Sequence, residues 1–161
     1  LNSYYATPSV ADEHGFTLAD APRPHIFDPF REAVAGKKVA VIGHFPFAPK
    51  ALNQAADFYM LERSLNEGDY PDSAAEYILP ECDYVFITGS AFVNKTAPRL
   101  LELSRDAFNV ILGPSTPLAP VLLEDYGVSL PTSPLAMFEG LSGTDAATTM
   151  FEWGHRAELS A

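Results

Sequence analysis

The stretch Val39-Ala-Val-Ile-Gly-His-Phe-Pro-Phe47 decides the fold of this 161-residue chain. Its first four residues are apolar without alternation, which is typical of a central strand in a parallel sheet that is covered on both faces. We expect this strand to run from about Lys38 to Ile42. A glycine follows at once, as in nucleotide-binding domains, but the next four residues are histidine, phenylalanine, proline and phenylalanine. No GxGxxG fingerprint and no Walker lysine motif occurs, so neither NAD nor ATP is predicted as a cofactor.

Further short apolar runs alternate with helical patterns along the chain. The other expected strands are Phe58–Leu61, Tyr84–Ile87, Asn109–Leu112 and a short fifth strand at Val128–Leu130. Helices are expected around Ala51–Ala56, from Ser73 to Pro80, after Thr96, after Thr116 and at Asp145–Trp153. This alternation predicts an α/β fold, a three-layer Rossmann-like domain with a mostly parallel five-stranded sheet and right-handed crossovers.

Capping residues set the expected helix ends. Asp28 followed by Pro29 predicts a helix start, and Gly36 predicts its left-handed end. Ser73-Ala-Ala-Glu76 has the pattern of a capping box. Residues 62–72, which lie before it, are expected to form a polar loop. Residues 1–24 are expected to be an arm or linker outside the sheet, and residues 25–161 the Rossmann-like domain.

Composition excludes several classes of partner. The net charge of −11 repels the phosphates of nucleic acids and anionic membrane surfaces. No apolar run approaches the roughly 20 residues that cross a bilayer, and no signal peptide is recognisable. The single cysteine, Cys82, precedes an apolar strand and is expected to be a small core residue. A cytoplasmic location is therefore predicted.

The candidate site is the rim formed by the carboxyl ends of the strands. In open α/β sheets ligands bind there, where glycines let a ligand approach the backbone and hydroxyls can hold an anionic group. The candidate ligand-binding residues are Gly43, Thr88, Gly89, Ser90, Asn94, Thr96, Gly113, Ser115 and Thr116. The alternative is that the hydroxyl and amide residues only cap helices.

His44 is the candidate for chemistry at this rim. A histidine can act as a base or as a metal ligand, and Glu62 and Asp69 on a neighbouring loop supply carboxylates for a mixed nitrogen and oxygen site. The alternatives are a hydrogen-bonded structural histidine and a solvated loop. Phe45 and Phe47 are expected either to pack against the sheet edge or to stack on a planar ligand.

Five segments together carry a family resemblance. They are Gly43-His-Phe-Pro-Phe47, Leu61-Glu-Arg63, Gly68-Asp-Tyr-Pro71, Ile87-Thr-Gly-Ser90 with Val93-Asn94 and Thr96, and Gly113-Pro-Ser-Thr-Pro117. In order and spacing they resemble the putative heavy-metal chelation family, formerly a domain of unknown function, over about residues 25 to 135. The resemblance implies a Rossmann-like C-terminal domain that follows a domain similar to the N-terminal part of enolase, with the active site in the cleft between them. Residues 1–16 look like the end of that first domain, so another domain or a second chain is expected to complete the cleft.

Three hypotheses of function follow. The first is a ligand-handling domain that binds a heavy metal or metal complex, of unknown identity, at the rim through His44, Glu62 and Asp69. The second is an enzyme that acts on a small phosphorylated or carboxylated metabolite with His44 as general base. The third is a protein-interaction module or homo-oligomer in which the rim residues are structural.

Overall fold

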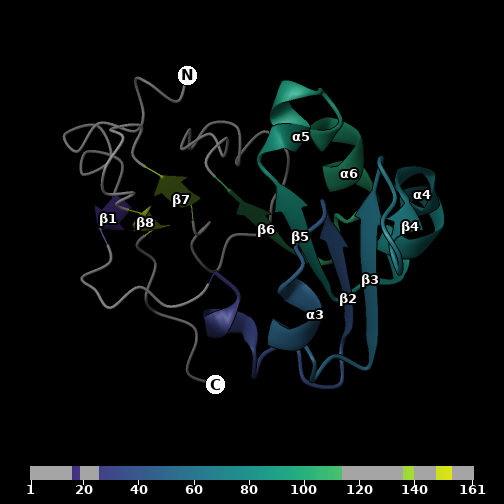
Figure 1. Ribbon diagram of the computed structural model, residues 1–161, viewed down its shortest axis with the longest axis horizontal. Helices are drawn as coiled ribbons and strands as arrows, with labels where there is room; N and C mark the ends of the chain where they lie inside the picture. Colours follow the sequence, from purple (N-terminus) through teal and green to yellow (C-terminus); the bar gives the residue numbers. More distant parts are fainter. Residues whose placement is uncertain (1–15, 19–25, 114–135, 140–147, 154–161) are drawn as a thin grey trace.

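The computed structural model describes residues 16–18, 26–113, 136–139 and 148–153, and its centre is a five-stranded parallel sheet (Figure 1). The strands are β2 (Lys38–Ile42), β3 (Asp57–Glu62), β4 (Tyr70–Pro71), β5 (Tyr84–Thr88) and β6 (Phe108–Leu112). Their order is β4-β3-β2-β5-β6, and every adjacent pair is parallel. The predicted α/β, Rossmann-like fold class is confirmed.

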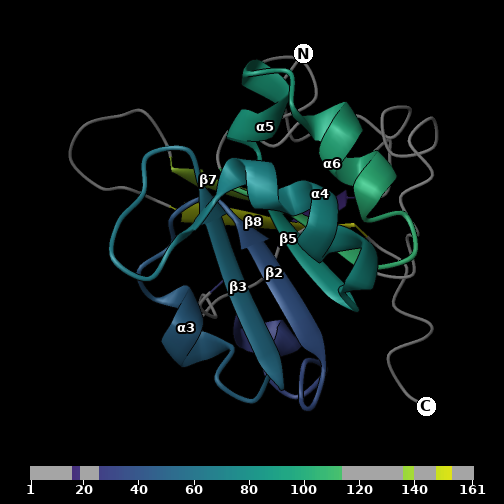
Figure 2. The same cartoon turned by 90° about the vertical axis from the view of Figure 1, so that its right-hand side faces the viewer.

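Short helices and turns connect these strands. They are η1 (Asp28–Phe30), α3 (Ala48–Ala51), η2 (Asp72–Ala74), α4 (Ala75–Ile78), η3 (Leu79–Glu81), α5 (Ser90–Val93) and α6 (Ala97–Leu103). Figure 2 shows α4 close to α6, with α3 well apart from both. None of the helices in the described ranges is long and apolar enough to cross a membrane.

Two apolar cores lie on opposite faces of the sheet, because successive side chains of a strand point to opposite sides. In β2, Ala40 and Ile42 belong to the core with α4, α5 and α6, whereas Val39 and Val41 belong to the core with α3. All four are buried, so β2 is the central covered strand that its unbroken apolar run predicts.

The same two cores define a switch in direction at the centre of the sheet. The connection from β2 runs through α3 on one face to β3, and the connection from β5 runs through α6 on the other face to β6. Because β2 and β5 are neighbours, their crossovers diverge, and a crevice is expected beyond their carboxyl ends.

The fifth strand is not the one that the sequence pattern indicated. It is β4, within the segment expected to be a polar loop, and it pairs with β3 through Leu61–Tyr70 and Glu62–Pro71. Residues 63–69 connect β3 to β4. This connection is short for a parallel pair, and it suffices because β4 contributes only two residues to the pairing. The predicted strand Val128–Leu130 lies outside the described residues.

A predicted helix at residues 145–153 is wrong. Thr148–Trp153 forms strand β8, which lies between β1 (Phe16–Leu18) and β7 (Ala136–Glu139) in a three-stranded antiparallel sheet. The sequence TTMFEW is rich in β-branched and aromatic residues, which favour extended backbone.

Helix starts also differ from the capping predictions. Phe27, not Asp28, holds the cap position of η1, and Asp28 pairs with Arg31. The expected capping box is absent, since no side chain caps η2 or α4 and Glu76 pairs with another helix. The expected helix does not extend to Gly36, because η1 ends at Phe30 and turns follow it; Gly36 nevertheless has the expected left-handed conformation, with a φ of +70°.

The aromatic residues after β2 pack on the protein itself. The ring centroids of Phe45 and Phe47 lie 5.9 and 5.8 Å from that of Phe27, which in turn packs edge-on against Phe86. These contacts fix the loop against the α3 face of the sheet, as the packing alternative predicts.

Gly43 is the tightest point of this loop, and its replacement by alanine should destabilise the fold. Its φ is +108°, and an added Cβ would lie 3.1 to 3.3 Å from side-chain atoms of Phe45 and Thr88. Gly68 also has a positive φ, of +89°, but nothing lies within 4 Å of its added Cβ. The backbone strain in each case costs roughly 1 to 3 kcal/mol. Urea unfolding should show a larger loss for Gly43→Ala than for Gly68→Ala; equal losses would contradict the close packing of Gly43.

Candidate functional site

The loops after β2 and β3 are joined by hydrogen bonds at the carboxyl end of the sheet. The amide of Gly43 donates to the carbonyl oxygen of Leu61 at 2.9 Å. The next amide, of His44, donates to the Glu62 carboxylate at 3.0 Å, and the other oxygen of this carboxylate accepts from the amide of Arg63 at 2.6 Å. One carboxylate thus holds two neighbouring loops together.

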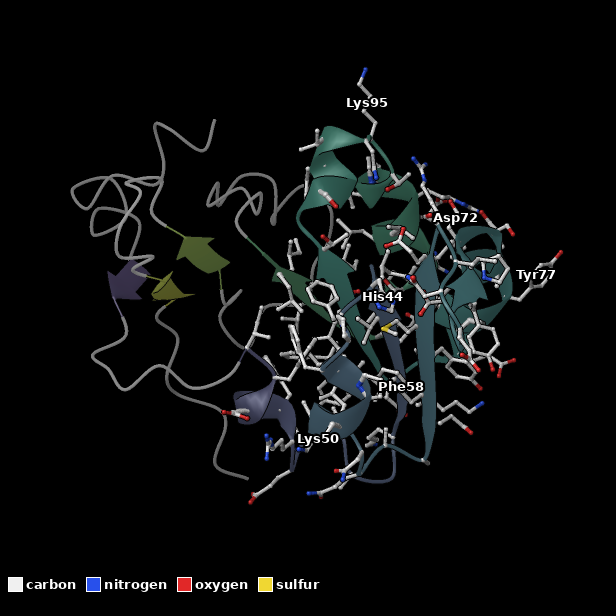
Figure 3. All side chains as sticks on the ribbon, viewed as in Figure 1. His44, Lys50, Phe58, Asp72, Tyr77 and Lys95 are labelled. Carbon is white, nitrogen blue, oxygen red and sulfur yellow. The ribbon has the colours of Figure 1, made fainter. Side chains whose placement is uncertain are left out.

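The imidazole of His44 is paired with Asp69. Its Nδ1 lies 2.9 and 3.1 Å from the two oxygens of Asp69, whose side chain is fully buried, while the His44 side chain is 31% exposed. Figure 3 shows His44 among side chains near the tip of β2, whereas Lys50 and Phe58 lie toward the other end of the strands. Because a carboxylate only accepts hydrogen bonds, the pairing places a proton on Nδ1 and leaves Nε2 as the second functional atom.

Asp69 is held in its ionised form. Burial alone would raise its pKa, but hydrogen bonds from the amide and side chain of Asn66 and from His44 outweigh this effect and lower the pKa below its usual range. The ionised Asp69 therefore keeps the His44 ring in one orientation.

A cavity of about 350 Å³ lies beside this pair, at the crevice between β2 and β5. Its apolar lining comprises Ile42, Leu61, Ala75, Ala91, Leu100 and Leu103. Its charged lining comprises Glu62, Arg63, Asp72, Glu76 and Arg99. The rest of the described lining consists of glycine and polar uncharged residues: Gly43, Ser73, Thr88, Ser90, Asn94 and Thr96. The cavity is thus bounded by α4, α6 and the ends of β2, β3 and β5.

Two ion pairs lie in the wall of the cavity. Nε of Arg63 donates to Asp72 at 3.1 Å. Arg99 on α6 makes two hydrogen bonds to Glu76 on α4, one of them 2.9 Å from Nε, and a third to Glu102 at 2.7 Å. The hydrogen bonds from Arg99 lower the pKa of Glu76 and raise that of Arg99.

The Thr88–Ser90 loop uses its polar groups locally. The hydroxyls of Thr88 and Ser90 are 3.0 Å apart, and the amide of Gly89 donates to the carbonyl oxygen of Leu112. Further along, the Asn94 side chain accepts hydrogen bonds from the amide and hydroxyl of Thr96, at 3.1 and 2.6 Å. An added ligand would therefore meet hydroxyls here rather than unpaired amides.

The predicted site residues separate into three groups. Those that line the cavity are Gly43, Glu62, Thr88, Ser90, Asn94 and Thr96. Those described but outside its lining are His44, Asp69, Gly89 and Gly113. Ser115 and Thr116 lie outside the described residues.

Three charged residues of the cavity, Asp72, Glu76 and Arg99, were not predicted to belong to the site. Arg63 is expected at the rim because it directly follows Glu62 at a strand end, although no role is predicted for it. The pairing of Arg99 with Glu76 could not be predicted, since these residues are 23 positions apart on two helices.

The possible metal ligands of the described residues do not cluster. Within the described ranges, no three His, Cys, Asp or Glu residues are grouped so that they could hold a metal ion. Cys82, the residue type that soft metals prefer, is buried before the amino end of β5, opposite the rim, and burial raises its pKa to about 11. Its expected place in the core is confirmed.

The fold and the cavity define an α/β domain whose polar strand ends surround one crevice. Over residues 25–133 the sequence matches the family model described as "Putative heavy-metal chelation", DUF364, and the chain belongs to this family. The predicted resemblance is confirmed.

Three individual proteins are similar to this chain over part of their length. A protein of unknown function from Desulfitobacterium hafniense, of the DUF364 family, is 42% identical with a TM-score of 0.79, and the match covers 93% of this chain and 64% of that one. A DUF364 structure from Pyrococcus horikoshii, 24% identical with a TM-score of 0.63 over 76% of this chain and 57% of that one, supports the fold alone. An uncharacterized protein of Methanocaldococcus jannaschii is 30% identical over 99 residues, which are 58% of this chain and 38% of that protein. The chain thus spans less than two thirds of the length of each of these relatives.

The pairing of Asp69 predicts an acid-dependent contribution to stability. Because the folded-state pKa of Asp69 is lowered, its contribution is present above the unfolded-state pKa of about 3.9 and is lost as the pH falls through the folded value. Asp69→Asn should therefore lower the free energy of unfolding at pH 7, and the gap to the wild type should close in acid. Glu67→Gln, in the same loop, is the control in urea unfolding at several pH values. A gap for Asp69→Asn that stays constant down to pH 3 would contradict the assignment.

Proposed function

We propose that this chain binds a small polar ligand in the cavity at the carboxyl end of its parallel sheet. The observation that carries the proposal is the position of the cavity, at the point where the crossovers from β2 and β5 diverge. Ligand sites of open α/β sheets lie at this point for topological reasons. A volume of about 350 Å³ is at the lower end of the range for small-molecule sites, so the ligand is metabolite-sized.

The make-up of the cavity wall supports the same proposal. Six apolar residues line the space, and charged and hydroxyl side chains from four segments of the chain surround it. An apolar lining that excludes water, with a few polar groups that set orientation, is the usual construction of a small-molecule site.

The family description raises the question of a heavy metal, and the described residues do not fit a direct chelate. Glu62 is engaged by two backbone amides and Asp69 by His44 and Asn66, so neither carboxylate is held for a metal alone. In the proposal, a metal is therefore bound by this chain as a complex, in which most of the metal's ligands belong to the bound compound and not to the protein. Nε2 of His44 would then add a single nitrogen donor.

A substitution that fills the cavity tests the proposal. Ser90 is exposed and lines the cavity, whereas Asn53 is exposed outside it. A panel of amino acids, carboxylates, phosphate esters and zinc or nickel chelates is screened by thermal shift. A ligand at a hundred times its dissociation constant stabilises a protein by about 2.7 kcal/mol. This shift should disappear in Ser90→Tyr and persist in Asn53→Tyr.

Two results of this screen would count against the proposal. A ligand that stabilises Ser90→Tyr as much as the wild type binds elsewhere, and a panel with no stabilising compound leaves the cavity without a ligand of these classes. A metal chelate that stabilises the wild type but not His44→Ala would support the metal-complex form.

A second candidate function is acid–base catalysis by His44 on the bound ligand, and the His44–Asp69 pair favours it. A carboxylate on Nδ1 fixes the tautomer in which Nε2 can accept a proton, which is how a histidine base is commonly oriented. Since the ring lies outside the cavity lining, the reacting group of the ligand must extend beyond Gly43.

The tautomer of His44 is directly measurable. Nitrogen-15 NMR of the imidazole should show the proton on Nδ1 in the wild type when the ring is neutral. Asp69→Asn should weaken this preference, because an amide can also donate to Nδ1. Asp72→Asn, which changes a carboxylate without contact to His44, should not. A wild-type ring protonated on Nε2 would remove the basis for this candidate.

A further inference from the structure

We propose that the ligand of this cavity carries a protonated amine beside a planar acceptor group, with the amine bound by Glu62 and the acceptor by Arg63. The simplest ligand class with both groups is an α-amino carboxylate. This inference rests on the proposed function and specifies the ligand of the same site.

The charges in the cavity wall do not balance. Among the described residues, three carboxylates and two guanidinium groups line the cavity. Asp72 is paired with Arg63, and Glu76 with Arg99. Glu62 is the remaining carboxylate, and it forms no ion pair with any basic side chain in the part of the chain that the structure describes. The cavity therefore has one unbalanced negative charge, which attracts a cation.

Glu62 also retains hydrogen-bonding capacity. Its two oxygens each accept one amide hydrogen, from His44 and from Arg63. A carboxylate has about four acceptor positions, so both oxygens can accept again. The hydrogen bonds from the two amides hold the Glu62 carboxylate in place. A protonated amine would supply further donors and the positive charge that this carboxylate has no partner for among the described residues.

The two arginines of the cavity differ in how fully their guanidinium groups are paired. Arg99 donates from Nε and both terminal nitrogens, to Glu76 on α4 and to Glu102 on its own helix, so it ties α4 to α6. Within the described part of the chain, the guanidinium of Arg63 donates from Nε alone, to Asp72. Its two terminal nitrogens form no hydrogen bond to any of the residues described, and such a fork matches a carboxylate in two parallel bonds.

Glu62 and Arg63 are consecutive residues at the end of β3, so one strand end presents both groups to the cavity. The apolar lining from Ile42, Leu61, Ala91 and Leu100 then suits an aliphatic portion of the ligand. A doubly charged phosphate fits less well, because it adds negative charge to a wall that already has an excess.

Isothermal titration calorimetry with four probes tests the inference: L-leucine, isoamylamine, isocaproate and inorganic phosphate. Isoamylamine lacks the carboxylate of leucine, and isocaproate lacks the amine. L-leucine should bind at least tenfold more tightly than either analogue, and phosphate should not bind. Equal affinity for leucine and isocaproate, or tighter binding of phosphate, would overturn the assignment.

Variants assign the two charged groups. Arg63→Met keeps the aliphatic stem and should weaken leucine at least tenfold while leaving isoamylamine unchanged. Arg105→Met, which changes an exposed arginine outside the cavity, is the control. Glu62→Gln should weaken the binding of both leucine and isoamylamine. Because this substitution also removes the charge of a carboxylate that accepts two backbone amides, the folding of the variant is checked by thermal unfolding. Unchanged leucine binding in Arg63→Met would overturn the role of Arg63 whatever Glu62→Gln does.

The outcome also separates this inference from the proposed function. If neutral compounds or phosphate esters bind and the Ser90→Tyr substitution abolishes their binding, the cavity is a ligand site and only the amine and carboxylate assignment fails. If no probe or panel compound binds in a manner sensitive to Ser90→Tyr, both proposals fail.

Discussion

The candidate site depends on the hydrogen bonds that the Glu62 carboxylate accepts. This carboxylate accepts the amide of His44 from the loop after β2 and the amide of Arg63 from the loop after β3. Besides this tie, the described residues join the two loops through the Gly43 to Leu61 backbone bond and through the His44–Asp69 pair. Since Glu62 also lines the cavity, the same group is both a structural tie and a part of the cavity wall.

This constraint acts within a frame that the sheet topology supplies. Because β2 and β5 send their crossovers to opposite faces, nothing in the parallel layer itself fills the space beyond their ends. Gly43 lines this space, and its positive φ and the close approach of Phe45 and Thr88 leave no room for a side chain there. The His44–Asp69 pair lies outside the cavity lining, and the Arg63–Asp72 pair lies within it.

Much of the fold could be predicted from the sequence because it depends on local patterns. The unbroken apolar runs at β2, β5 and β6 identify covered parallel strands, and the spacing of Ala97, Leu100 and Leu101 identifies the buried face of α6. The strand β4 could not be predicted, because two residues that include a proline have no strand pattern. The site was predictable only as a set of strand ends. Two features of the site depend on side-chain positions that no sequence spacing encodes. One is the acceptance of backbone amide hydrogens by Glu62, and the other is the pairing of Arg99 with Glu76.

The measurement that tests this account most directly is a nitrogen-15 amide map of the chain during titration with the compound that stabilises it most in thermal-shift screening. The account predicts that the amides of Gly43, His44, Arg63 and Ser90 change most, since the two loops joined by Glu62 and the start of α5 border the ligand. Changes confined to residues such as Lys50 and Asn53, with the Glu62 loops unaffected, would contradict it.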